Sequence, residues 1–165
     1  MYNALGFGTG VDRHTGMGLL NTKAAVDVAS QTLSFASTSP VSHGHAFGVL
    51  DPNVDFDGIW VHGNFYFAVQ EPTSLRIVLA WNRPVDKSLN CSPCEGLKPD
   101  LNMLLRDMDY PTSAVAYAHT WDPSEEFLVA SVLPGKLYRL DIYKQNTWPG
   151  PMSVGLAAYT TNNPQ

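Results

Sequence analysis

From residue 34 to the end of the chain, short runs of β-branched and aromatic residues alternate with clusters of Pro, Gly, Asn and Asp. This pattern is typical of short strands separated by turns. Within several runs, apolar and polar residues alternate with a period of two, which predicts sheets with one buried and one wetter face. The strands that we expect are His45–Leu50, Ile59–Val69, Ser74–Trp81, Leu101–Met108, Val115–Trp121, Phe127–Leu133, Leu137–Tyr143 and Ser153–Tyr159.

Two runs show the alternation clearly. In SLRIVLAW, one predicted face carries Leu75, Ile77, Leu79 and Trp81. In LYRLDIY, one face carries Leu137, Arg139, Asp141 and Tyr143, and the other carries Tyr138, Leu140 and Ile142. We therefore expect Trp81 and Tyr138 to lie in the core.

The segment Leu19–Ser30, LLNTKAAVDVAS, is the one convincing helix in the sequence. It contains neither Pro nor Gly, and Leu20, Ala24 and Val28 recur at four-residue spacing, which gives one apolar side. Because strands and helices do not alternate along the chain, a parallel α/β sheet is excluded. We predict an all-β fold, an antiparallel β-sandwich of the jelly-roll type with about eight strands and one N-terminal helix.

Composition narrows the classes of partner. The 165 residues fit one sandwich, and the net charge is −5 with 15% charged residues. No basic run or Arg-rich stripe is present, so nucleic acid is excluded as a partner. No apolar stretch approaches the roughly 20 residues of a membrane helix, and the first residues, MYNALGFGTG, lack the features of a signal peptide. We therefore expect no membrane partner.

The segment GTGVDRHTGMGLLNTKAAVDVA, residues 8–29, resembles the closing segment of subtilisin-like serine proteases, in which a Gly-x-Gly turn leads into an L-N-A-x-x-A helix. The matching residues are Gly16-Met17-Gly18-Leu19-Leu20-Asn21 and Ala24-Ala25-Val26. Thr22 stands where Ala is usual.

The rest of the chain resembles the β-sandwich that is appended to many subtilisin-like proteases. The pieces that match are SLRIVLAWNRPV at 74–85, LNML at 101–104, EFLV at 126–129 and LPGKLYRL at 133–140. Their order and spacing agree with the family, so the resemblance covers nearly the whole chain. It implies that residues 1–30 are the tail of a catalytic domain and that residues 34–165 are an accessory domain.

The nucleophile motif of that family, Gly-Thr-Ser-Met-Ala-x-Pro-His, is absent, and Gly10 stands where Ser would be in Gly8-Thr9-Gly10. A serine nucleophile needs a base and an orienting acid in register. We therefore predict no catalytic residue in this chain, and a module that stabilises a subtilisin-like catalytic domain of the same polypeptide and shapes substrate access. The resemblance also implies a secreted protein. The alternative is a stand-alone module that binds carbohydrate or protein.

No cofactor is certain from the sequence, and calcium is the one that two acidic regions suggest. The first region begins like an EF-hand loop but has Phe56 and His62 where that loop needs Gly and Glu. An irregular calcium loop and a solvated turn both remain open there, and we favour the turn. The second region is a candidate through the resemblance alone. The candidate ligands are Asp51, Asn53, Asp55, Asp57, Asp100 and Asn102.

Three further features have competing interpretations. Cys91 and Cys94 form the one CxxC pair, for which we favour a loop disulfide over free thiols or a metal or redox site. His43 and His45, with His62, suggest a surface metal site, although we favour ordinary loop histidines. Candidate aromatic residues for an exposed ligand-binding stripe are Trp60, Tyr66, Tyr117, Trp121, Tyr143 and Trp148, and the alternative for them is the core.

Overall fold

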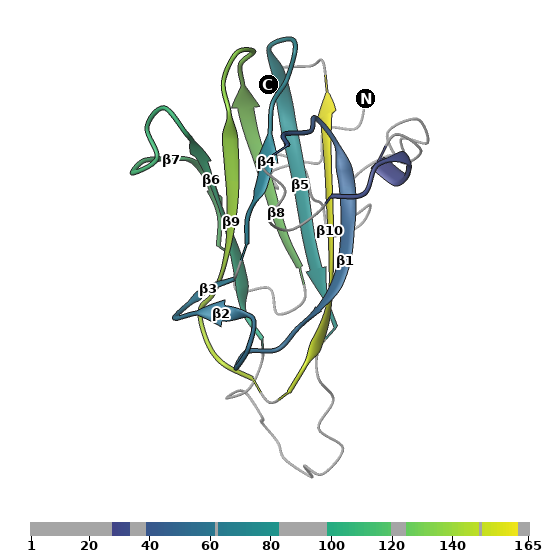
Figure 1. The fold of residues 1–165 in the computed structure, drawn as a ribbon, viewed down its shortest axis with the longest axis vertical. Helices are drawn as coiled ribbons and strands as arrows, with labels where there is room; N and C mark the ends of the chain where they lie inside the picture. Colours follow the sequence, from purple (N-terminus) through teal and green to yellow (C-terminus); the bar gives the residue numbers. More distant parts are fainter. Residues whose placement is uncertain are drawn as a thin grey trace, which may run out of the picture.

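Two antiparallel sheets face each other in the computed structural model, which describes residues 28–33, 39–61, 63–82, 99–119, 125–148 and 150–161 (Figure 1). The strands are β1 (Gly44–Leu50), β2 (Phe56–Asp57), β3 (Trp60–Val61), β4 (Phe65–Phe67), β5 (Thr73–Trp81), β6 (Leu101–Asp107), β7 (Ala114–Ala118), β8 (Glu125–Val132), β9 (Tyr138–Lys144) and β10 (Met152–Thr161). Within the described ranges, no helix is long and apolar enough to cross a membrane.

The strand order is that of a jelly roll. One sheet has the order β1-β10-β5-β8, and the other has β2-β3-β9-β6-β7, with β4 also paired to β9. When β2, β3 and β4 are counted as one interrupted strand, every connection crosses between the sheets except the β6–β7 hairpin. This arrangement confirms the predicted all-β sandwich of eight strands.

The observed strands follow the predicted ones closely, with one exception. The expected strand Ile59–Val69 is divided into β3 and β4, and Gly63 between them has a φ of 101°. A positive φ interrupts the extended backbone that a single strand needs. Only Val28–Ser30 of the predicted helix falls within the described residues, where it is helical, and residues 19–27 lie outside them.

The core lies between the sheets and uses the face that the alternation predicts. Leu75, Ile77 and Leu79 of β5 are fully buried, and so are the residues that β6 contributes from the opposite sheet, which are Leu101, Met103 and Leu105. Burying one such side chain stabilises the fold by about 1.5–3 kcal/mol. Trp81 and Tyr138 are buried, as expected.

The segment before β1 is attached to this strand by hydrogen bonds. Thr32 pairs with His45 as a parallel bridge, the His45 amide donates to the Gln31 carbonyl at 2.9 Å, and Leu33 is buried in the core. A Cβ atom on Gly44, whose φ is 150°, would come within 2.7 Å of the Gln31 carbonyl oxygen. The approach of residues 31–33 to β1 therefore requires glycine at position 44.

Candidate binding surfaces

The outer face of the six-stranded sheet carries a cluster of aromatic and guanidinium groups. Trp60 of β3 is opposite Tyr143 of β9, and their rings lie 5.1 Å apart at 54°. The guanidinium carbon of Arg106 lies 5.9 Å from the centre of the Trp60 ring, which is cation–π distance. Trp60 is 37% exposed, so this group of side chains can still meet a ligand.

Asp141 holds the two arginines of this surface together. Its carboxylate lies 2.7 Å from Nε of Arg106 and 2.7 Å from Nε of Arg139. The hydrogen bond to Asp141 is the main reason that the pKa of Arg139 is raised. Because one buried carboxylate faces two guanidinium groups, the cluster has a net positive charge.

These side chains surround an open hollow of about 460 Å³. Its wall also includes Asn64, whose amide donates to Asp141 at 2.9 Å when its oxygen and nitrogen are exchanged. A flat aromatic ring beside fixed donors and a carboxylate suits a ligand with an apolar face and a polar edge. The side chains that line it are Asp57, Trp60, Val61, Asn64, Arg106, Arg139, Asp141 and Ile142.

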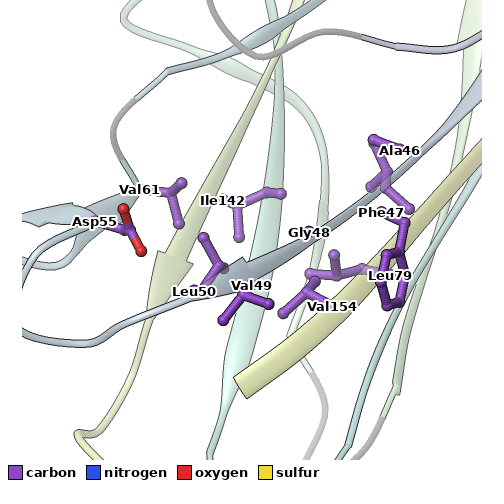
Figure 2. Close-up of a pocket in the computed structure, with 11 residues that line it drawn as sticks. Ala46, Phe47, Gly48, Val49, Leu50, Asp55, Val61, Leu79, Ile142 and Val154 are labelled. Carbon is purple, nitrogen blue, oxygen red and sulfur yellow. The ribbon is translucent and has the colours of Figure 1, made fainter. Parts of the chain in front are cut away.

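A second hollow of about 240 Å³ opens between the sheets beside β1 (Figure 2). Ala46 and Phe47 lie at one end of it, and Val61 and Asp55 lie at the other. Asp55 is the one charged group in a lining that is otherwise apolar. The hollow reaches the core side chains of Leu79, Ile142 and Leu156, so it is a gap in the packing of the open edge of the sandwich.

The first acidic region forms a turn in which the carboxylates bind backbone amides. Asp51 accepts a hydrogen bond from the Asn53 amide at 2.9 Å, and Asp55 accepts one from the Asp51 amide at 2.7 Å. These contacts are those of the solvated-turn alternative. Asp57 lies apart from them on β2 and is exposed.

The second acidic region is buried. Asn102 donates to Asp100 at 3.3 Å, and the Asp100 amide donates to Asn146 at 3.1 Å. Burial raises the pKa of Asp100, although His119 and the bond from Asn102 oppose that rise. Among the described residues no three His, Cys, Asp or Glu side chains gather in a metal-binding group. Calcium binding at either region stays a prediction.

The two described histidines of the predicted surface metal site have other contacts. Nδ1 of His43 lies 2.9 Å from the Ser42 hydroxyl, and Nδ1 of His45 donates to the Val28 carbonyl at 2.9 Å. His45 therefore fastens the segment before β1, a role that the sequence did not suggest. His62, Cys91 and Cys94 lie outside the described residues.

The aromatic candidates divide into two groups. Tyr117 is 71% exposed, and Trp60, Tyr66 and Tyr143 are partly exposed. The prediction for Trp148 was wrong, because this side chain is 97% buried and meets the edge of the Phe56 ring at 5.7 Å. It follows β9 and closes one end of the core, which strand alternation cannot reveal. Trp121 lies outside the described residues.

Sequence reasoning placed Arg139, Asp141 and Tyr143 on one face but missed Arg106 and Asn64. The signal for Arg106 lies in the strand LNMLLRD, where Arg106 alternates with the buried Leu105 and Asp107. Its pairing with Arg139 depends on the register of β6 on β9, which is not visible in a single strand.

Comparison with known proteins gave one structural likeness. No family model and no curated protein matches the chain. Among solved structures, the chain is similar to the pre-peptidase C-terminal domain of a collagenase from Bacillus anthracis. The identity is 15%, the TM-score is 0.47, and the match covers 74% of this chain and 99% of that chain.

Proposed function

We propose that this chain is the C-terminal part of a subtilisin-like serine endopeptidase, in which the β-sandwich is a non-catalytic accessory domain. Residues 1–30 form the tail of the catalytic domain, and residues 34–165 form the accessory domain. The sandwich stabilises the catalytic domain of the same polypeptide and shapes the access of substrate. A secreted location follows from this parentage.

The short connection between the two parts is the observation that carries the proposal. Val28–Ser30 is a helical turn, and Leu33 is already part of the core of the sandwich. Three residues therefore join the predicted tail to the sandwich, and they are bonded to β1. A connection this short and this fixed favours an accessory domain that packs against its neighbour over one on a flexible tether.

The sequence motifs support the same parentage through their positions in the jelly roll. The stretches that resemble the subtilase accessory domain fall on β5, β6 and β8 and on the turn that enters β9. The resemblance also places the catalytic Ser upstream of Gly8. The chemistry of this proposal therefore belongs to the neighbouring domain, and the sandwich contributes packing and shape.

The nucleotide sequence upstream of the Met1 codon tests the parentage. We expect a continuous reading frame that encodes the Asp, His and Gly-Thr-Ser-Met-Ala motifs of a subtilisin-like catalytic domain. A stop codon in frame a short distance upstream would contradict the proposal.

The Trp60 surface favours a second candidate function, a carbohydrate- or protein-binding module. Trp60, Tyr143 and Arg106 combine an exposed ring with fixed donors beside an open hollow. A glycan and peptide array tests it, with Trp60→Ala as the variant and Tyr117→Ala as the matched control on the same sheet. Saturable binding that Trp60→Ala abolishes and Tyr117→Ala retains would support it, and an array without binding would contradict it.

A further inference from the structure

A continuous apolar surface covers the outer face of the four-stranded sheet. On the edge strand β1, Phe47 is 78% exposed and Val49 is 57% exposed. We call this surface the outer apolar face, and its residues are Phe47, Val49, Val78, Ala80, Phe127, Val129, Gly155 and Ala157. Soluble proteins rarely leave an apolar surface of this kind without a partner.

The strand register gives this face a low floor between two higher walls. Phe47 of β1 is opposite Gly155 of β10, which is opposite Ala80 of β5. In the next outward row, Ala157 is opposite Val78, which is opposite Phe127 of β8. The central strands thus carry small side chains, and the outer strands carry phenylalanines. The Phe47 ring also leans over Gly155, since a Cβ there would lie 4.0 Å from it.

Charges are sparse on this face. Of the charged side chains on its four strands, Arg76 and Glu125 alternate with buried neighbours and so point outward, whereas Glu126 is buried. They occupy different rows, beside Val129 and Ala80 respectively. A face with so little charge suits an apolar segment better than a polar ligand.

The chain itself arrives at this surface. His45 lies in an outward row of β1, two residues before Phe47, and its Nδ1 donates to the Val28 carbonyl at 2.9 Å. The helical turn Val28–Ser30 is therefore held against β1, on the side away from β6 and β7 (Figure 1). The residues that precede this turn begin their course next to Phe47.

The preceding segment has the length and the pattern that the face requires. A helix over residues 19–30 would be about 18 Å long, and four strands span about 14 Å from the first axis to the last. Leu20, Ala24 and Val28 would share one side of that helix, and Lys23 would point about 100° away from it. An apolar helix side and an apolar sheet face of matching length are the elements of helix-on-sheet packing.

We propose that residues 19–27 continue the turn at Val28–Ser30 as a helix and dock on the outer apolar face of the sheet. Leu20 and Ala24 pack between Phe47 and Phe127, over the small residues of β10 and β5. The docking is a property of the 165-residue chain and is independent of the proposed protease parentage.

Amide hydrogen exchange of the full chain, followed by mass spectrometry, tests the docking. In the wild type, we expect peptides from residues 19–27 to exchange at least about tenfold more slowly than an unstructured chain of the same sequence. Phe47→Asp should remove this protection and leave the β5 and β9 amides unchanged. Val54→Asp is the matched control, because Val54 is 66% exposed but lies in the turn after β1.

Leu20→Asp approaches the same contact from the segment itself. It should remove the same protection, and the double variant with Phe47→Asp should add little, since both substitutions break one contact. Exchange of residues 19–27 at unstructured rates in the wild type would overturn the proposal. Protection that disappears on dilution, with a dimer seen in sedimentation velocity, would also overturn it by assigning the face to a second copy of the chain.

Discussion

Asp141 is the residue on which the guanidinium cluster depends. Its carboxylate is buried and lies between Arg106 and Arg139, whose side chains are 17% and 27% exposed. Loss of the negative charge leaves two like charges close together in a partly desolvated site. The cluster is therefore more sensitive to this one residue than to either arginine.

Asp141→Asn should lower the free energy of unfolding by about 1–3 kcal/mol, because the two arginines lose their shared counterion and are only partly hydrated. Urea unfolding followed by tryptophan fluorescence measures the change. Asp57→Asn is the control, since Asp57 lines the same hollow but is exposed. Equal stability of the two variants would contradict this role for Asp141.

The ion pair between Asp107 and Lys136 predicts a dependence of stability on pH. The hydrogen bond from Lys136, together with the bond from the Asp109 amide, lowers the pKa of Asp107. A lowered pKa in the folded state means that this contribution is present above the ordinary pKa of Asp and is lost as pH falls through the folded value. The same bond raises the pKa of Lys136, so its contribution is lost only as pH rises through the raised value.

Asp107→Asn should therefore lower the melting temperature at pH 7 and make little difference near pH 2, where Asp107 of the wild type is protonated. Calorimetric scans of both proteins across the acid range measure this convergence. An equal deficit at both pH values would show that the ion pair has no part in the effect.

Asp100 predicts the opposite slope. Because burial raises its pKa, the folded protein holds this proton more tightly than the unfolded chain. The ionised carboxylate therefore costs stability, and this cost grows as pH rises from the ordinary pKa of Asp through the folded value. Asp100→Asn should remove this slope, as measured by urea unfolding between pH 3 and pH 7. A variant that retains the wild-type slope would contradict the assignment to Asp100.

At the scale of elements, the attachment of residues 31–33 to β1 depends on a single glycine. Gly44→Ala should cost about 1–3 kcal/mol, because the new Cβ would meet the Gln31 carbonyl at a backbone φ of 150°. Gly48→Ala is the control on the same strand, since its Cβ would meet no atom within 4 Å. Thermal unfolding of both variants measures the difference. A Gly44→Ala protein as stable as the control would show that the segment can move aside without cost.

The strands were predictable from the sequence because their signal is local. Alternation alone placed Leu75, Ile77 and Leu79 on the buried face of β5, where they lie. The break between β3 and β4 was not predictable, because it depends on the positive φ of Gly63 and on how β9 pairs with both pieces. The burial of Trp148 was missed for a similar reason, since it follows from a contact with Phe56, which is distant in sequence.

The candidate surface was predictable only in part. The alternation of LYRLDIY shows that Arg139 and Asp141 share an outward face. It does not show that Arg106, 35 residues earlier in the chain, meets Asp141. That meeting is set by the β6–β9 register, in which Arg106 is opposite Arg139. A single sequence does not specify such non-local pairing.

At the scale of the whole molecule, the jelly roll separates two surfaces with different chemistry. The six-stranded sheet presents the cluster of Trp60, Arg106 and Asp141, and the four-stranded sheet presents the outer apolar face beside the entry of the chain. An accessory domain needs both kinds of surface, one to pack on its neighbour and one to remain open. The central claim is that the neighbour is a subtilisin-like catalytic domain.

The native polypeptide tests that claim most directly. An antibody raised against the 165-residue chain should capture, from the culture medium of the organism that carries the gene, a polypeptide well above 18.1 kDa. A fluorophosphonate probe should label the serine of that polypeptide, and the probe should abolish its hydrolysis of casein. Capture of an 18.1 kDa polypeptide that the probe does not label would contradict the account.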